Sequence, residues 1–88
     1  MDVEDLSKLV IDRGLELDAD FVEFRFHKIF EEKVKVKNGE IISKSSKYSY
    51  GVDIRVFIDG SIGFSSTNVL TENNLLRSVE IAVSIAKN

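Results

Sequence analysis

Few side chains in this sequence could carry out catalytic chemistry. The chain has one histidine, His27, and no cysteine. A metal-dependent hydrolase of the helical type needs His-Glu-x-x-His, so that two imidazoles share one helix face and the glutamate lies beside the metal-bound water. Glu31 and Glu32 follow His27, but there is no second histidine and the residues before them alternate like a strand. We therefore expect no metal ligand here and interpret His27 as a solvent-facing strand residue.

A run of hydroxyl side chains occurs at Ser65, Ser66 and Thr67. A nucleophilic serine needs a base and, in the hydrolase elbow, a strained Gly-x-Ser-x-Gly turn. No such turn surrounds these residues, and the only available base is the single histidine. Residues 60–63, Gly-Ser-Ile-Gly, lack the Gly-Lys-Ser/Thr ending of a phosphate-binding loop and lead into a strand. The sequence therefore predicts no catalytic residue in this chain.

Lysines and tyrosines form the one suggestive surface feature. A two-residue turn at Asn38-Gly39 would place a fourth lysine opposite the first of three that alternate along one strand face. Such a face could bind a peptide or single-stranded nucleic acid, although a formal net charge of −3 argues against nucleic acid. Lysines on an exposed strand also prevent aggregation between sheets, so both interpretations stay open. The residues concerned are Lys33, Lys35, Lys37, Lys44, Tyr48 and Tyr50.

Length and composition indicate one small domain. The 88 residues contain no stretch rich in Pro, Gly or Ser that could act as a linker, so residues 1–88 are expected to fold together. A domain of this size buries only about 60 to 65% of its unfolded surface, which leaves little room for an enclosed catalytic cavity. The first ten residues are acidic and no apolar run is long enough to cross a membrane. We expect a cytoplasmic location.

Hydrophobic periodicity predicts a helix at each end of the chain. Asp2 is positioned to cap a helix over residues 3–13, with Gly14 as its stop signal. Thr71 is positioned to cap the second helix. The buried stripe of that helix is predicted to consist of Leu75, Val79, Ala82, Val83 and Ala86.

The segment between the helices predicts four strands in two hairpins. Alternating residues from Val22 to Phe26 form the first strand, which a turn near Phe30–Glu32 separates from the Asn38-Gly39 hairpin. The last two strands flank Asp59-Gly60. The expected fold is α+β: a two-layer sandwich in which two helices cover a four-stranded antiparallel sheet.

The loop at Asp59-Gly60 decides which residues of the second hairpin are paired. A two-residue loop would place Val56 opposite Gly63 and leave the apolar faces of the two strands out of step. A three-residue loop with a bulge at Gly60 would instead place Val56 opposite Ile62, and Ile54 opposite Phe64, so that the apolar faces coincide. The sequence therefore favours the bulged loop.

An ordered set of motifs resembles the N-terminal domain of the TldD/PmbA family. Members of that family are often described as modulators of DNA gyrase, and the full-length proteins look like zinc metallopeptidases that act on small or unfolded peptides. The matching residues are Ala19-Asp20, Glu23, Arg25, Asn38-Gly39-Glu40, Gly51-Val52, Arg55-Val56, Asp59-Gly60, Gly63-Phe64-Ser65-Ser66-Thr67-Asn68, Ala82 and Ala86.

The resemblance implies a non-catalytic accessory domain. The zinc site of the family, a His-Glu-x-x-x-His helix with a further ligand, belongs to the later part of a much longer chain, and no segment here matches it. In such a protein this domain would help enclose the substrate chamber and assemble a homo- or hetero-oligomer. Its partners would be a downstream catalytic domain or a second subunit, together with the peptide substrate. The alternative is a stand-alone binding module that uses the lysine face.

Within this resemblance, Arg55 is the residue most suited to contact a substrate or partner. Its guanidinium could hold a carboxylate in a fixed orientation, or it could form a cross-strand pair with Glu23 or Asp53. The small residues after it would allow another backbone to come close, either a helix of the same domain or a segment of the catalytic domain. The weak candidates for such contacts are Gly63, Ser65, Ser66 and Asn68.

Overall fold

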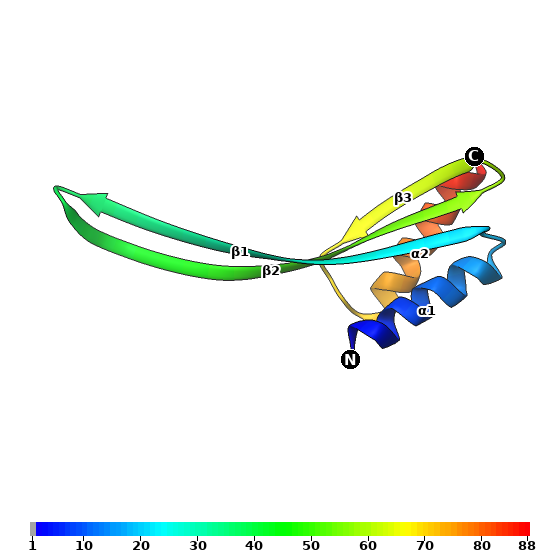
Figure 1. The fold of residues 1–88 in the computed structure, drawn as a ribbon, viewed down its shortest axis with the longest axis horizontal. Coiled ribbons are helices and arrows are strands. Elements are labelled where there is room, and N and C mark those ends of the chain that lie inside the picture. Colours follow the sequence, from blue (N-terminus) through cyan, green and yellow to red (C-terminus); the bar gives the residue numbers. More distant parts are fainter. Residues whose placement is uncertain (1) are drawn as a thin grey trace.

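The computed structural model describes residues 2–88, which form two helices and a three-stranded antiparallel sheet. The strand order is β1-β2-β3, and both helices pack on one face of the sheet (Figure 1). The predicted two-layer α+β architecture is confirmed, whereas the predicted four-stranded sheet is wrong because the sheet has three strands. The elements are α1 (Val3–Glu16), β1 (Phe21–Lys37), β2 (Glu40–Ile58), β3 (Ser61–Thr67) and α2 (Glu72–Lys87).

The missing fourth strand is explained by the length of β1. The predicted turn at Phe30–Glu32 does not occur: Phe30 is paired with Tyr48 on β2, and the centres of their rings lie 4.9 Å apart. This segment contains none of the Gly, Pro, Asn or Asp residues that favour turns. The strand therefore continues without a break to the Asn38-Gly39 turn.

β1 and β2 extend well beyond the helices as a two-stranded ribbon (Figure 1). β3 ends at Thr67, which is opposite Val52, so past that point the sheet consists of β1 and β2 alone. We call this part, residues 27–51, the arm. It accounts for the elongated shape of the molecule, whose longest dimension is 60 Å.

Both hairpin turns have two central residues with positive φ. The φ angles are 51° at Asn38 and 79° at Gly39, and 48° at Asp59 and 82° at Gly60. Positive φ at both positions is the signature of a type I′ turn, whose twist matches that of the flanking strands. The predicted Asn38-Gly39 turn is confirmed, and the Asp59-Gly60 turn has the same type I′ conformation.

The predicted bulged loop at Gly60 is wrong: Val56 is paired with Gly63, and Ile54 with Ser65. The reason lies in the helix layer. Gly63 is buried under α2, and a Cβ atom at this position would overlap the carbonyl oxygen of Ala82. Small residues are therefore needed on the side of β3 that faces the helix, and the large side chains at Ile62 and Phe64 face the opposite side of the sheet.

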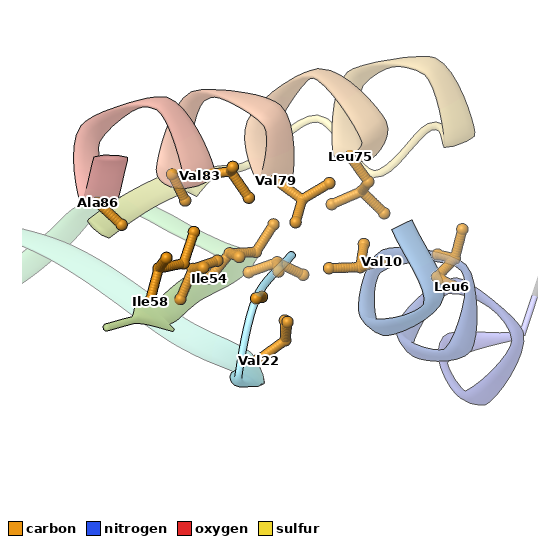
Figure 2. Packing of buried hydrophobic residues seen from close by; sticks show 13 residues of the cluster. Leu6, Val10, Val22, Ile54, Ile58, Leu75, Val79, Val83 and Ala86 are labelled. Carbon is orange, nitrogen blue, oxygen red and sulfur yellow. The ribbon is translucent and has the colours of Figure 1, made fainter. Parts of the chain in front are cut away.

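The core lies between the sheet and the two helices (Figure 2). Val52, Ile54 and Val56 line the inner face of β2 and have relative exposures of 1% or less. The predicted inner stripe of α2 is buried in full. The core residues are Leu6, Val10, Ala19, Val22, Val52, Ile54, Val56, Ile58, Leu75, Val79, Ala82, Val83 and Ala86.

Both predicted N-caps are confirmed, whereas the predicted end of α1 is wrong. Asp2 accepts a hydrogen bond from Glu4 N, and Thr71 Oγ1 accepts one from Asn74 N at 3.2 Å. α1 continues past Gly14, which is buried at a point where a Cβ atom would crowd Val22 of β1. Gly14 therefore serves close packing of α1 on the sheet.

We predict that Gly63→Val destabilises the domain by about 3 kcal/mol or more, because its side chain would have to displace the α2 backbone at Ala82. Urea unfolding followed by circular dichroism measures this change. Ser66→Val is the matched control, because Ser66 is exposed on the opposite face of the same strand. Equal stability of the two variants would contradict the close approach of α2 to β3.

Candidate functional site

The hydroxyl run at the end of β3 divides between the two sides of the sheet. Ser65 Oγ donates a hydrogen bond of 2.6 Å to the carbonyl oxygen of Ser78 on α2. Thr67 Oγ1 accepts hydrogen bonds from Val69 N at 3.0 Å and from the side-chain amide of Asn74 at 2.5 Å. Ser65 and Thr67 therefore fasten β3 and the following loop to α2.

Asn74 completes this polar connection. Its side-chain amide also donates to the carbonyl oxygen of Val69 at 2.9 Å, so one side chain ties the loop to the first turn of α2. The sequence prediction missed this residue. The signal available in the sequence was its position three residues after the N-cap Thr71, where side chains can contact the preceding loop.

A surface hollow of about 390 Å³ lies where β3 ends and the arm begins. His27 Nε2 lies 3.6 Å from Asp53 Oδ1 on its floor. The His27 ring covers Gly51, where a Cβ atom would overlap the ring. The predicted Ser66 and Asn68 both border this hollow, which is lined by His27, Ile29, Ser49, Tyr50, Gly51, Asp53, Ser66, Thr67 and Asn68.

The ionisable side chains that line the hollow are those of His27, Tyr50 and Asp53. His27 is half-buried beside Asp53, so the sequence prediction of a simple solvent-facing residue described only part of its environment. Within residues 2–88, no group of three His, Cys, Asp or Glu side chains is close enough to hold a metal ion. Neither helix of this part of the chain is long and apolar enough to span a membrane.

Arg55 lies on the outer face of the sheet, which the helices leave uncovered. It is exposed, and in the register it lies between Glu23 on β1 and Phe64 on β3. Although Glu23 is its direct cross-strand neighbour, the Arg55 guanidinium forms no ion pair within residues 2–88. Asp53, the other expected partner of Arg55, lies beside His27. The guanidinium is thus free to meet a carboxylate from outside the domain.

The register corrects the predicted position of Lys44. Lys33 is opposite Ser45, and Lys44 is opposite Val34, because a bulge between Lys35 and Val36 shifts the pairing by one residue. Because side chains alternate between the faces, Lys44 lies on the opposite face of the arm from Lys33. Its Nζ atom is 3.5 Å from a carboxylate oxygen of Glu32.

The lysine row and the tyrosines also lie on opposite faces of the arm. Lys33, Lys35 and Lys37 alternate on the outer face, whereas Tyr48 is paired with Phe30 on the face that continues from the core. The predicted surface of lysine interleaved with tyrosine is therefore not formed by these residues.

A different lysine accompanies the tyrosines. Lys28 Nζ lies 4.4 Å from the centre of the Tyr48 ring and 5.8 Å from that of Tyr50. Phe26 stacks on Tyr50 with ring centres 6.1 Å apart. This arrangement requires Lys28 to be directly opposite Tyr50 in one continuous hairpin. The sequence prediction did not include it, because it placed a turn at Phe30–Glu32.

We predict that Asn74→Ala lowers the free energy of unfolding by about 1 to 2 kcal/mol, because the Thr67 hydroxyl and the Val69 carbonyl both lose a hydrogen-bond donor. Asn73→Ala is the control, since Asn73 is exposed at the neighbouring position of the same helix. Thermal or urea unfolding compares the two variants. A smaller loss for Asn74→Ala than for Asn73→Ala would show that the loop does not depend on this amide.

Comparison with known proteins places this arrangement in a family. The solved structure of TldE from Thermococcus kodakarensis superimposes with a TM-score of 0.73 at 21% sequence identity, which shows a shared fold. The match covers 93% of this chain and 18% of that chain. An uncharacterized protein of Methanocaldococcus jannaschii, MJ0231, is 31% identical over 80 residues, which is 91% of this chain and 18% of the relative.

The chain thus spans about a fifth of the length of each of these two proteins. The family model described as PmbA/TldA metallopeptidase domain 1 matches residues 22–86, from the first core residue of β1 almost to the end of α2. The matched segment therefore includes the sheet, the arm, the Ser65–Asn68 stretch and α2, and this chain belongs to the PmbA/TldD family as its N-terminal domain.

Proposed function

We propose that this chain serves as the non-catalytic N-terminal domain of a TldD/PmbA-like zinc metallopeptidase that cleaves small or unfolded peptides. The observation that carries the proposal is the match of residues 22–86 to the first domain of that metallopeptidase family. The parent protein would act in the cytoplasm.

The arm supports a role in enclosing a chamber. It projects away from the helices (Figure 1). Its large apolar side chains are exposed. Phe30 and Tyr48 are 52% and 57% exposed. Large exposed apolar side chains on one side of a ribbon favour contact with other protein surfaces. In the parent protein the arm would contact the catalytic domain and wall the space in which the peptide is bound.

The stand-alone binding module has less support than this proposal. It relied on Lys33, Lys35 and Lys37 acting together with the two tyrosines, and the register separates those groups onto opposite faces of the arm. The one lysine near the tyrosine rings is Lys28. A single lysine over two rings gives little electrostatic attraction to a nucleic-acid backbone, whose affinity depends on several neutralised phosphates.

We predict that cells producing this domain contain it within a polypeptide several times heavier than 9.9 kDa. The reason is that the match covers only 18% of the length of the relative MJ0231. Immunoblotting of a cell extract with an antibody raised against residues 2–88 measures that mass. Protease inhibitors and rapid denaturation of the cells control for breakdown of the parent protein. A dominant band near 9.9 kDa would instead favour a stand-alone protein.

We also predict that the purified chain neither hydrolyses unstructured peptides nor retains stoichiometric zinc. Cleavage is followed by mass spectrometry after incubation with added Zn²⁺, and retained metal is quantified by elemental analysis after dialysis. His27→Ala is the internal control, since His27 is the only histidine and therefore the best available zinc ligand. Hydrolysis, or one zinc per chain that is lost in His27→Ala, would refute the non-catalytic assignment.

A further inference from the structure

The tip of the arm is a two-residue turn that lies far from both helices (Figure 1). Asn38 and Gly39 are exposed, and a Cβ atom at Gly39 would meet no other atom within 4 Å. Within residues 2–88, the Asn38 side chain takes part in no hydrogen bond. No contact of this kind therefore holds its amide group in place.

The residue after an asparagine determines whether the asparagine side chain can react with the main chain. The backbone nitrogen of that residue can attack the side-chain carbonyl carbon and close a five-membered ring. A hydrogen bond donated by this nitrogen, or a side chain beside it, hinders the attack. Gly39 has no side chain, and its N–H donates no backbone hydrogen bond among residues 2–88. In a type I′ turn the closing hydrogen bonds belong to the flanking residues, here Lys37 and Glu40.

The other asparagines that have a following residue among residues 2–88 differ from Asn38 at this nitrogen atom. They are Asn68, Asn73 and Asn74, and in each case the following backbone N–H donates a hydrogen bond. The bonds run from Val69 N to Thr67 Oγ1 at 3.0 Å, from Asn74 N to Thr71 Oγ1 at 3.2 Å, and from Leu75 N to the carbonyl oxygen of Thr71 at 2.9 Å. The fold therefore leaves only the nitrogen after Asn38 unbonded within this set.

We propose that Asn38 is a site of spontaneous deamidation, in which the Gly39 nitrogen is the nucleophile and water is the co-reactant. The Gly39 nitrogen bonds to Asn38 Cγ, the Cγ–Nδ2 bond breaks, and ammonia leaves with the proton of the Gly39 amide. Water then opens the resulting succinimide at one of its two carbonyl carbons. Opening at Cγ gives aspartate, and opening at the backbone carbon gives isoaspartate, in which the main chain runs through the side chain.

The arm permits the backbone movement that ring closure requires. The type I′ conformation, with a φ angle of 51° at Asn38, must open before the Gly39 nitrogen can reach Cγ. Past Thr67 the sheet consists of two strands only, and a two-stranded hairpin without a covering layer has little local stability. Opening of the tip disturbs no core residue, because every residue of the core cluster lies outside residues 27–51.

Isoaspartate would change the end of the arm. It adds one carbon atom to the main chain, whereas the two-residue turn fixes the spacing that places Lys37 opposite Glu40. Both products also add a negative charge close to Glu40. We therefore expect the strand pairing at the tip to loosen while the helices and the core stay intact. The reaction needs no metal, substrate or partner, so it is independent of the proposed function.

The test follows each asparagine while the purified, folded chain is incubated in mildly alkaline buffer. Peptide mass spectrometry quantifies the conversion of amide to acid, and enzymatic methylation detects isoaspartate. We expect conversion at Asn38 to be at least about tenfold faster than at Asn68, Asn73 or Asn74, because only Gly39 combines an unbonded nitrogen with the absence of a side chain. The rate should rise with pH, since the attacking nitrogen must lose its proton. Asn38→Gly keeps a residue suited to the turn and should abolish the isoaspartate signal.

A second variant separates the effect of the fold from that of the Asn-Gly sequence. Val69→Gly gives Asn68 the same glycine neighbour that Asn38 has, while the nitrogen at position 69 keeps its acceptor, Thr67 Oγ1. In the folded variant we expect Asn68 to react at least about threefold more slowly than Asn38, because its hydrogen bond must first break. In concentrated urea, which unfolds the chain, the two rates should become similar. Circular dichroism checks that the variant is folded in buffer.

Three outcomes would overturn the inference: an Asn38 that reacts no faster than the other asparagines, conversion to aspartate without isoaspartate, or an Asn68 in folded Val69→Gly that reacts as fast as Asn38. The first would show that Asn38-Gly39 serves the turn alone. The second would exclude the succinimide route, and the third would show that the hydrogen bond does not protect. None of these results depends on peptide hydrolysis or zinc.

Discussion

The α2 backbone packs so closely on β3 that this contact governs the arrangement of the sheet. At Gly63 there is no room for a Cβ atom, because the carbonyl oxygen of Ala82 occupies that space. The inner side of β3 must therefore consist of small residues, and the large side chains of Ile62 and Phe64 are directed outward. One steric contact thus sets the register of the second hairpin and places Ile62 and Phe64 on the outer face of the sheet.

The same packing also organises the polar end of β3. Once α2 lies against Gly63, the Ser65 hydroxyl can reach the carbonyl oxygen of Ser78, and Asn74 can bind both Thr67 and Val69. The main role of the Ser65–Asn68 stretch in this structure is therefore to hold β3 against α2 by hydrogen bonds. Only Ser66, Thr67 and Asn68 also border the hollow beside His27 and Asp53. Ser65 and Thr67 thus take part in hydrogen bonds that hold the structure together.

The arm and the outer face present different surfaces to other proteins. On the core side of the arm, aromatic pairs such as Phe30–Tyr48 continue the apolar face of the sheet beyond the reach of the helices. On the outer side, Glu23 is opposite Arg55 and Arg25 is opposite Asp53, next to the row of Phe21, Phe57 and Ile62. Further along the arm, Lys33 and Lys35 are opposite serines. The core side of the arm is thus aromatic, whereas the outer face of the sheet combines charged and apolar rows.

Local sequence signals were sufficient to predict the two helices with their caps at Asp2 and Thr71, the Asn38-Gly39 turn and the inner stripe of α2. These features depend on local backbone chemistry and on periodicity along one element. Contacts between elements were needed to establish the length of β1, the register of β3, the burial of Gly14 and Gly63, and the separation of Lys33 from Tyr48. Each of those outcomes depends on what lies across the sheet or in the opposite layer, and a small residue whose role is to admit another backbone leaves no local signal.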